Sequence, residues 1–302
     1  MEKTEYTELN ETVLRLLPAR KKRSNKGTYG KVLCIAGSVN MAGAAYLCAY
    51  AAYRSGAGLV RVLTPKENRV IIQNLIPEAV LTTFDTENPD DQALSDALAW
   101  ATAVALGPGL GQETWAKELT RKVLSSFHKP LVLDADGLNH VAKEKELLKD
   151  HQGDLILTPH VGEFSRLAQH AIPDILSDVP GYAARFGKEN GCICVLKDAP
   201  TAIGDPEGNC YVNTTGNNGM STGGSGDVLT GIIAGLLAQK ALPLDAACLG
   251  VWLHGRAGDL AVEKEGPYGM MARHLIEHLP EAMVVQKKKG DQEDEKLSAG
   301  MR

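Results

Sequence analysis

The stretch with the clearest chemical potential runs from Asn217 to Gly231, where small residues lead into an apolar segment through Gly224-Ser225-Gly226-Asp227. Unpaired backbone N–H groups at a helix start bind anions, and glycines let a phosphate approach the main chain closely. An acid beside such a site can accept the proton of a hydroxyl group that attacks a phosphoryl group. Asp227 could instead only cap the helix and complement its dipole, and the loop alone leaves both roles open. No Gly-Lys-Ser/Thr follows, so the loop is not a Walker P-loop.

Other candidate groups follow apolar runs that read as strands. Gly107-Pro108-Gly109-Leu110-Gly111 comes directly after one such run, and Asp134-Ala135-Asp136-Gly137-Leu138-Asn139 continues another. Ligands of open α/β sheets bind outside the carboxyl ends of the strands, so the glycine-rich turn favours close ligand approach. The Asp134–Asn139 run could also be simple turn chemistry, which leaves Asp136 and Asn139 as weak candidates.

The elements that must position these groups alternate between short β-rich runs and helical segments. The expected strands are Val32–Ala36, Val60–Leu63, Ala103–Leu106, Leu131–Asp134, Leu155–Leu157 and Ile193–Leu196. The expected helices are Gly43–Ser55, Ala93–Ala101, Glu113–Ser126, Glu163–Gln169, Gly226–Gln239, Leu244–Glu263 and Ala272–Leu279, with an opening helix before Pro18. Continuously apolar strands predict a mostly parallel sheet covered on both faces, hence a doubly wound three-layer α/β/α fold. We expect one domain over residues 1–285 and a charged, disordered tail over 286–302.

Composition limits the classes of partner and the compartment. The 302 residues carry a net charge of −5, which gives no electrostatic case for nucleic acid or an anionic membrane. The uncharged stretch Val32–Tyr53 is interrupted by Gly37, Ser38 and Asn40, so it predicts a strand, loop and helix rather than a membrane span. The six cysteines form no Cys-x-x-Cys and lie in apolar runs, and the acidic start is no signal peptide. These features favour the cytoplasm.

Six ordered motifs together resemble a known family. Gly224-Ser225-Gly226-Asp227 is similar to the anion hole of the ribokinase-like superfamily, in which the Asp is the catalytic base. The other five resemble the ADP/ATP-dependent NAD(P)H-hydrate dehydratases: Lys26–Leu33 with Gly37–Ala45, Gly107–Gly111, Leu133–Asn139, Leu157–Glu163 and Lys197–Thr201. The similarity extends from about Lys26 to about Leu279.

The resemblance implies a repair enzyme for damaged nicotinamide cofactor. Its substrate would be hydrated NADH or NADPH (NADHX or NADPHX), whose ring hydroxyl is phosphorylated by ADP or ATP, after which phosphate leaves and the double bond returns. This route is chemically reasonable because phosphate is a far better leaving group than hydroxide. Mg²⁺ would bridge the nucleotide phosphates.

The resemblance also implies roles for individual residues. Asp227 would be the base, and the amides of Gly224, Ser225 and Gly226 would hold the transferring phosphoryl group. Residues implied for the hydrated dinucleotide are Ala44, Gly109, His160 and Asp227; those implied for the nucleotide are Lys197, Asp198, Ala199, Pro200, Thr201 and Gly226. Glu163 would approach the metal through water. His160 stands where many kinases of this fold have Asn, which favours the dehydratase.

Two alternatives stay open. A vitamin or sugar kinase would share the fold and the anion hole, and a catalytically silent nucleotide-binding module would share the loop but would not need Asp227. Relatives are often tetramers, and many are fused to an epimerase. Since only about 25 residues precede the similarity, the resemblance predicts a stand-alone dehydratase served by a separate epimerase.

Overall fold

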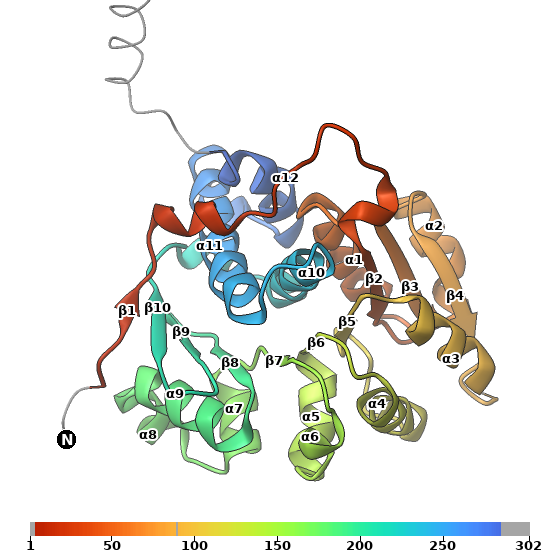
Figure 1. Ribbon diagram of the computed structural model, residues 1–302, viewed down its shortest axis with the longest axis horizontal. Coiled ribbons are helices and arrows are strands. Elements are labelled where there is room, and N and C mark those ends of the chain that lie inside the picture. Colours follow the sequence, from red (N-terminus) through yellow and green to blue (C-terminus); the bar gives the residue numbers. More distant parts are fainter. Residues whose placement is uncertain (1–3, 89, 285–302) are drawn as a thin grey trace, which may run out of the picture.

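The computed structural model describes residues 4–88 and 90–284 and contains a ten-stranded sheet between two layers of helices (Figure 1). The strands are β1 (Thr7–Glu8), β2 (Lys31–Ile35), β3 (Leu59–Pro65), β4 (Val80–Phe84), β5 (Ala103–Leu106), β6 (Leu131–Leu133), β7 (Leu155–Leu157), β8 (Ile193–Leu196), β9 (Thr201–Gly204) and β10 (Cys210–Asn213). Their order is β1-β10-β9-β8-β7-β6-β5-β2-β3-β4, and all neighbouring pairs are parallel except those made by β9.

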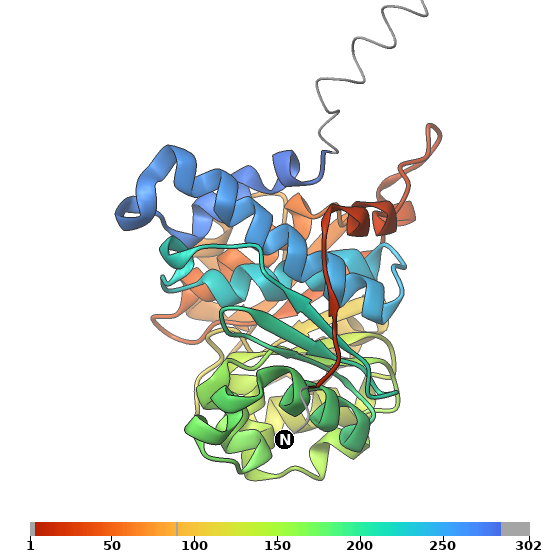
Figure 2. The same ribbon diagram turned by 90° about the vertical axis from the view of Figure 1, so that its left-hand side faces the viewer.

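Each face of the sheet builds its own core, because successive strand residues point to opposite sides. One face packs against α1 (Ala42–Arg54), α2 (Arg69–Leu75), α10 (Ser225–Ala238), α11 (Pro243–Gly269) and α12 (Ala272–Ala282). The other packs against α3 (Asp91–Trp100), α4 (Thr114–Ser126), α5 (Ala135–Lys143), α6 (Leu147–Asp150), α7 (Val161–Ala168), α8 (Ile172–Ser177) and α9 (Val179–Asn190). Figure 2 shows the two layers from the side. The prediction of a mostly parallel three-layer fold is confirmed.

The strand order reverses beside β2. The chain first adds β3 and β4 on one side of β2, then crosses to place β5, β6, β7 and β8 on the other. In open α/β sheets the crevice at such a reversal, at the carboxyl ends of the strands, is the usual ligand site. The fold therefore directs attention to the loops that follow β2 and β5.

Helix α10 is held by unusually close packing against α1. A Cβ atom on Gly231 would lie 2.1 Å from the carbonyl oxygen of Cys48, and one on Gly235 would lie 2.0 Å from Oγ of Ser55. Only glycine allows this approach. Residues Val228–Ala238 are all buried. The tight packing of these residues fixes the position of the first turn of α10.

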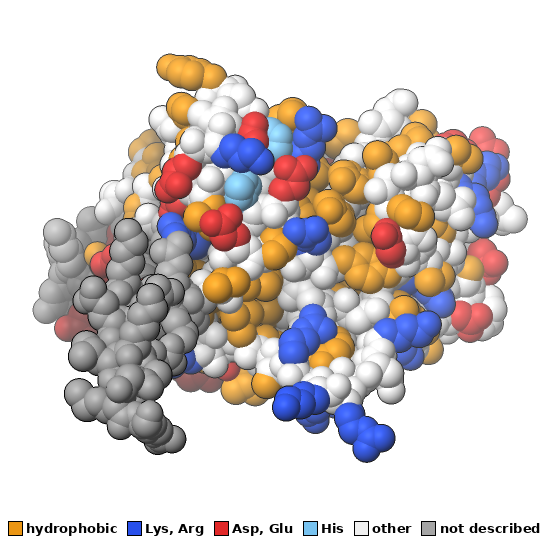
Figure 3. Space-filling view, turned by 90° about the horizontal axis from the view of Figure 1, so that it is seen from above, with side chains coloured by type: hydrophobic (Ala, Val, Ile, Leu, Met, Phe, Trp, Pro, Cys, Tyr) orange, Lys and Arg blue, Asp and Glu red, His pale blue; other side chains and the backbone are white. Residues whose placement is uncertain are grey.

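All six cysteines are free and buried, as their apolar surroundings predict. Cys34, Cys48 and Cys248 lie in the core on the α10 side of the sheet, whereas Cys192, Cys194 and Cys210 lie in the opposite core. Among the described residues no helix is long and apolar enough to cross a membrane. On the face formed by α11 and α12, both signs of charge occur with apolar side chains between them (Figure 3).

The structure specifies some local predictions. The opening helix before Pro18 is a 3₁₀ helix, η1 (Glu11–Leu16), because Pro18 follows too soon for a stable α-helix. The Asp134–Asn139 run, for which turn chemistry was one alternative, forms the start of α5. The remaining 3₁₀ helices are η2 (Lys26–Tyr29), η3 (Lys66–Asn68) and η4 (Asn218–Met220). The tail predicted over 286–302 lies outside the described residues, so the division of the chain into domain and tail stays a prediction.

Candidate active site

The site begins at the reversal of strand order, where the loops after β2 and β5 meet. The N–H of Gly37 donates a hydrogen bond to the carbonyl oxygen of Pro108 over 2.8 Å. Gly109 has a positive φ of 60°, and a Cβ atom there would lie 2.7 Å from Cβ of Ala44 in α1. Ala44 and Gly109, which are far apart in the sequence, therefore pack directly against each other, because only glycine fits beside the methyl group of Ala44.

The first turn of α10 lies between this surface and the end of β8. Gly224 is the residue before the helix, and a Cβ atom there would lie 2.3 Å from the side chain of Leu47, one turn along α1 from Ala44. A Cβ atom on Gly226 would lie 3.2 Å from Nζ of Lys197, which follows β8. Among the described residues, the N–H of Ser225 donates to the carbonyl oxygen of Thr222 over a long 3.4 Å, and no backbone acceptor is found for the N–H groups of Gly224 and Gly226, so this turn can bind an anion.

Asp227 lies within the first turn of α10, where a negative charge also complements the helix dipole. Burial, and then the negative charge of Asp134, raise the pKa of Asp227 to about 7, although Lys197 opposes the shift. A carboxyl group with such a pKa can accept a proton near neutral pH.

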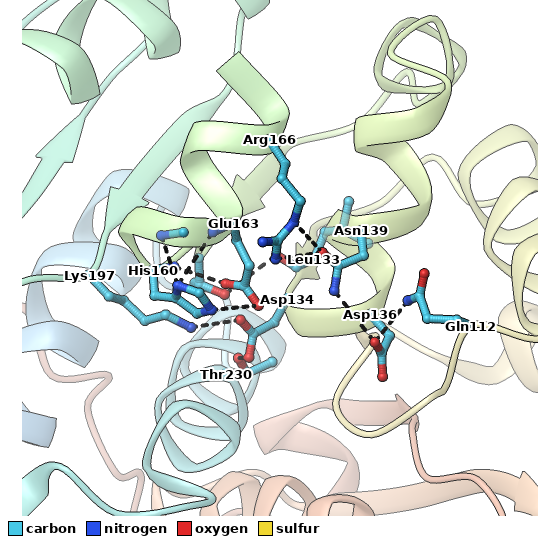
Figure 4. A network of polar contacts seen from close by, with 12 residues as sticks. Gln112, Leu133, Asp134, Asp136, Asn139, His160, Glu163, Arg166, Lys197 and Thr230 are labelled. Carbon is cyan, nitrogen blue, oxygen red and sulfur yellow. Dashed lines mark hydrogen bonds and ion pairs between the residues drawn. The ribbon is translucent and has the colours of Figure 1, made fainter. Parts of the chain in front are cut away.

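A buried ion pair between Asp134 and Lys197 is attached to α10 through Thr230 (Figure 4). Asp134, only 1% exposed, accepts hydrogen bonds from Nζ of Lys197 at 2.8 Å and from Oγ1 of Thr230 in α10 at 2.7 Å. Burial would lower the pKa of Lys197, but the carboxylates of Asp134 and Glu163 outweigh it and raise that pKa. Lys197 is therefore a fixed positive charge beside the predicted phosphoryl position.

His160 and Glu163 form a capping box at the start of α7. Nδ1 of His160 accepts hydrogen bonds from the N–H groups of Gly162 and Glu163, and the carboxylate of Glu163 accepts the N–H of His160 over 2.9 Å. Nδ1 can accept only when it carries no proton, so in a neutral ring the proton is on Nε2, which lies 3.5 Å from Oε1 of Glu163. Both oxygens of Glu163 therefore face His160, and a metal role for Glu163 would act through water.

A pocket of about 800 Å³ lies beside the end of β8. It brings together all six residues that the resemblance implied for the nucleotide, with Ser225 beside Gly226. Its lining includes His160, Lys197, Asp198, Ala199, Pro200, Thr201, Ser225 and Gly226. Ala44 and Gly109 are not part of this lining and lie on the α1 side of the first turn of α10.

Sequence reasoning missed His254, which lies in α11 and lines the same pocket. Its Nε2 lies 2.9 Å from the carbonyl oxygen of Ser225. Burial lowers the pKa of His254 to about 4, so the ring is neutral and Nε2–H donates to that carbonyl. Surrounded in sequence by Trp252, Leu253 and Gly255, His254 carries no local signal that separates it from a core residue.

Among the described residues no three His, Cys, Asp or Glu side chains are grouped so that they could hold a metal ion by themselves. Both oxygens of Asp134 are taken by Lys197 and Thr230. A Mg²⁺ ion usually keeps several waters and binds through substrate phosphates and one or two carboxylates. The site therefore fits only a metal that arrives with a phosphate ligand.

Comparison with known proteins gives a consistent picture. The family model described as NAD(P)H-hydrate dehydratase matches residues 32–281. A bifunctional NAD(P)H-hydrate repair enzyme of Moorella thermoacetica is 41% identical over 271 residues, covering 87% of this chain and 51% of the relative. The chain thus spans about half the length of this relative.

Solved structures agree in fold. An ADP/ATP-dependent NAD(P)H-hydrate dehydratase from Bacillus subtilis, co-crystallised with ATP and Mg²⁺, is 33% identical with a TM-score of 0.79, covering 90% of this chain and 95% of that one. A ribokinase-like superfamily protein from Enterococcus faecalis has a TM-score of 0.81 at 28% identity, covering 92% of this chain and 95% of that one. The prediction of a ribokinase-like fold is confirmed.

Proposed function

Because the chain belongs to the NAD(P)H-hydrate dehydratase family, we propose that it dehydrates NADHX and NADPHX to NADH and NADPH at the expense of ADP or ATP. The observation that carries the proposal is the position of the Asp227 carboxyl group in the first turn of α10, where its pKa is raised to about 7. That turn contacts α1, which bears Ala44, through Gly224 and contacts Lys197 through Gly226. A dinucleotide on the α1 side and a nucleotide on the β8 side would meet at one carboxylate.

The proposed reaction has two steps. Asp227 takes the proton of the ring hydroxyl as its oxygen bonds to the terminal phosphorus, and the bond from that phosphorus to the nucleotide's bridging oxygen breaks. The amides of Gly224, Ser225 and Gly226, together with Lys197, stabilise the charge on the phosphoryl oxygens. The ring C–O bond then breaks, phosphate leaves, and a proton is lost from the adjacent ring carbon to restore the double bond.

We propose that Mg²⁺ enters with the nucleotide, as the co-crystallised relative with ATP and Mg²⁺ suggests. When bound, it supplies positive charge to the phosphate oxygens. The chain's own contribution would be small, since Glu163, whose two oxygens face the N–H and Nε2 of His160, would act through water.

Turnover tests the proposal directly. The full chain incubated with NADHX, Mg²⁺ and either ADP or ATP should regenerate the absorbance of reduced nicotinamide, with one phosphate released per NADH. Omitting the nucleotide is the control and should abolish the signal. Accumulation of a stable phosphorylated product without NADH would instead identify a small-molecule kinase, and nucleotide binding without turnover would identify a silent module. The ADP and ATP arms also decide the nucleotide preference.

The activity should rise with pH through about 7, because Asp227 must be unprotonated to act as base and its pKa is raised to about 7. The charge of Asp134 and burial both favour the protonated form, so the inactive fraction grows as the pH falls. A profile of kcat/KM for NADHX against pH measures this rise in activity. A flat profile from about pH 5 to 9 would contradict the assignment of Asp227 as base.

Gly226→Ala should abolish most activity without weakening the fold. Gly226 lies in the first turn of α10, where alanine favours the helix, but the added Cβ atom lies 3.2 Å from Nζ of Lys197 in the space proposed for the phosphoryl group. We expect kcat/KM to fall about 100-fold while the melting temperature is retained. Gly223→Ala is the matched control, since a Cβ atom at Gly223 meets nothing within 4 Å. Equal activity of the two variants would contradict the proposed phosphoryl position.

We also propose partners and assembly on the strength of the family resemblance. A separate epimerase would supply the reactive form of the hydrate, a homotetramer would be the functional assembly, and the cytoplasm would be the compartment. The bifunctional name of the Moorella relative supports a second repair activity beside this one. Light scattering of the purified chain tests the tetramer, and adding an epimerase to an assay of an equal mixture of the two NADHX epimers should double the final yield of NADH.

A further inference from the structure

The segment Gly107–Gly111 lies in the loop between β5 and α4. The N–H of Gly107 donates to the carbonyl oxygen of Ile35, and the carbonyl oxygen of Pro108 accepts from the N–H of Gly37. These bonds fix the segment to β2 and to the loop that follows β2. They do not involve Gly111, the last residue of the segment.

Two side chains of α5 hold Gly111 by its own peptide groups. The carboxylate of Asp136 accepts the N–H of Gly111 over 2.8 Å, and Nε2 of His140 lies 2.9 Å from the carbonyl oxygen of Gly111. Asp136 and His140 are four residues apart in α5, so both side chains lie on one helix face one turn apart. Donor and acceptor of one residue are thus bound by consecutive turns of a single helix.

Helix α5, which holds Gly111, is itself bonded to the residues of the candidate site. Asp134, the residue before α5, bonds Lys197 and Thr230. On the outer side, Arg166 of α7 donates to Oδ1 of Asn139, next to Asp136 (Figure 4). The position of the loop is therefore set by the same framework that sets α10.

His140 has no other evident task. It is 1% exposed, and burial lowers its pKa, so the ring is neutral. Because a carbonyl oxygen can only accept, the proton is on Nε2. The Nδ1 atom is buried and makes no hydrogen bond within the described residues. A buried Nδ1 atom without a partner costs desolvation free energy that a phenyl ring at the same position would not cost. A histidine here is therefore best explained by the hydrogen bond that Nε2 makes with Gly111.

We propose that Asp136 and His140 are positioning residues that hold Gly109 against Ala44 in the geometry that receives the hydrated dinucleotide, and that they take no part in phosphoryl transfer. This inference rests on the proposed function. It assigns to α5 control over the affinity for the dinucleotide but not over that for the nucleotide, whose pocket is lined by other segments.

The test compares variants that keep volume with variants that keep the hydrogen bond. His140→Phe keeps the ring and removes the donor, His140→Gln keeps a donor, and Asp136→Ala removes the acceptor. We expect His140→Phe and Asp136→Ala each to raise the KM for NADHX about tenfold, with the nucleotide KM changed less than about twofold and kcat nearly retained. His140→Gln should recover most of the loss. Because both side chains hold one residue, the double variant should lose less than the product of the single losses.

The matched control is His151→Phe. His151 is also buried and has no hydrogen-bond partner for either ring nitrogen within the described residues, but it lies between α6 and β7. The variant His151→Phe should leave the KM for NADHX unchanged. Affinity for NADPH, measured by calorimetry without turnover, should be weakened in His140→Phe and Asp136→Ala and mostly recovered in His140→Gln.

The outcomes separate this inference from the proposed function. If the wild-type chain fails to convert NADHX, the proposed function fails, and NADPH affinity still tests the grip on Gly111. If the wild-type chain turns over but His140→Phe and Asp136→Ala leave the KM for NADHX unchanged, the positioning role is wrong. Equal rises of both KM values, or no recovery in His140→Gln, would also overturn it.

Discussion

Asp227→Asn should reduce turnover of NADHX by about a thousandfold or more, because the amide cannot accept the hydroxyl proton. Nucleotide binding should survive, since the pocket beside β8 is lined by other residues and the backbone of α10 is unchanged. Single-turnover measurement of NADH formation, with calorimetric titration of ADP or ATP, distinguishes the two effects.

The same variant should be more stable than the wild type above neutral pH. The pKa of Asp227 is raised from 3.8 to about 7 in the folded protein, so between these values the folded state binds the extra proton. Stability therefore falls as the pH rises through this window, and asparagine removes that dependence. Melting temperatures should differ at about pH 8 and converge at about pH 4.

Asp245→Asn is the matched control, because Asp245 also lies in the first turn of a helix, α11. If Asp227 only complemented a helix dipole, the two variants would behave alike. Wild-type turnover in Asp227→Asn would rule out a base at this position.

Breaking the ion pair beneath α10 should have the largest effect on stability. Lys197→Met leaves the carboxylate of Asp134, 1% exposed, without its positive partner. Removing one partner of a buried pair typically costs about 3–5 kcal/mol. Urea unfolding of the full chain should show this loss, and turnover should fall because the charge beside Gly226 is gone.

Adding a second substitution to Lys197→Met should separate the loss of stability from the loss of turnover. Lys197→Met combined with Asp134→Asn removes the stranded charge while Thr230 keeps an acceptor, so most of the stability should return. Activity should not return. Lys122→Met, which breaks the exposed pair of Lys122 with Asp91, is the control and should change stability by less than about 1 kcal/mol. Full activity in the double variant would contradict a role for Lys197 toward phosphate.

The strands nearest the site were the most predictable part of the fold. Ala103–Leu106, Leu155–Leu157 and Ile193–Leu196 match β5, β7 and β8 residue for residue, because strands buried on both faces are continuously apolar. Helix α5 was missed, since Asp134, Asp136 and Gly137 are turn formers by local preference and only tertiary contacts make them helical. Strands β1, β4, β9 and β10 were missed because polar residues lie within or beside their apolar positions.

The candidate site was predictable in its loops and not in its long-range contacts. The residues of Gly224–Asp227 by themselves indicate an anion site with an adjacent acid. Ala44 has no comparable sequence signal and was predicted only from the family resemblance. The bond between Asp134 and Lys197 joins residues 63 positions apart, and the grip of His140 on Gly111 spans 29. Pairings of this kind depend on the topology of the sheet, which local patterns do not encode.

The six buried cysteines allow local unfolding to be followed by thiol labelling. Burial raises the pKa of Cys192, Cys210 and Cys248 to about 12, so little thiolate is present in the native state and alkylating reagents should react slowly. Three thiols lie in each of the two cores, so identifying which ones are alkylated first would tell which helical layer detaches from the sheet first. A ligand that bridges α1 and α10 should selectively slow labelling of Cys34 and Cys48.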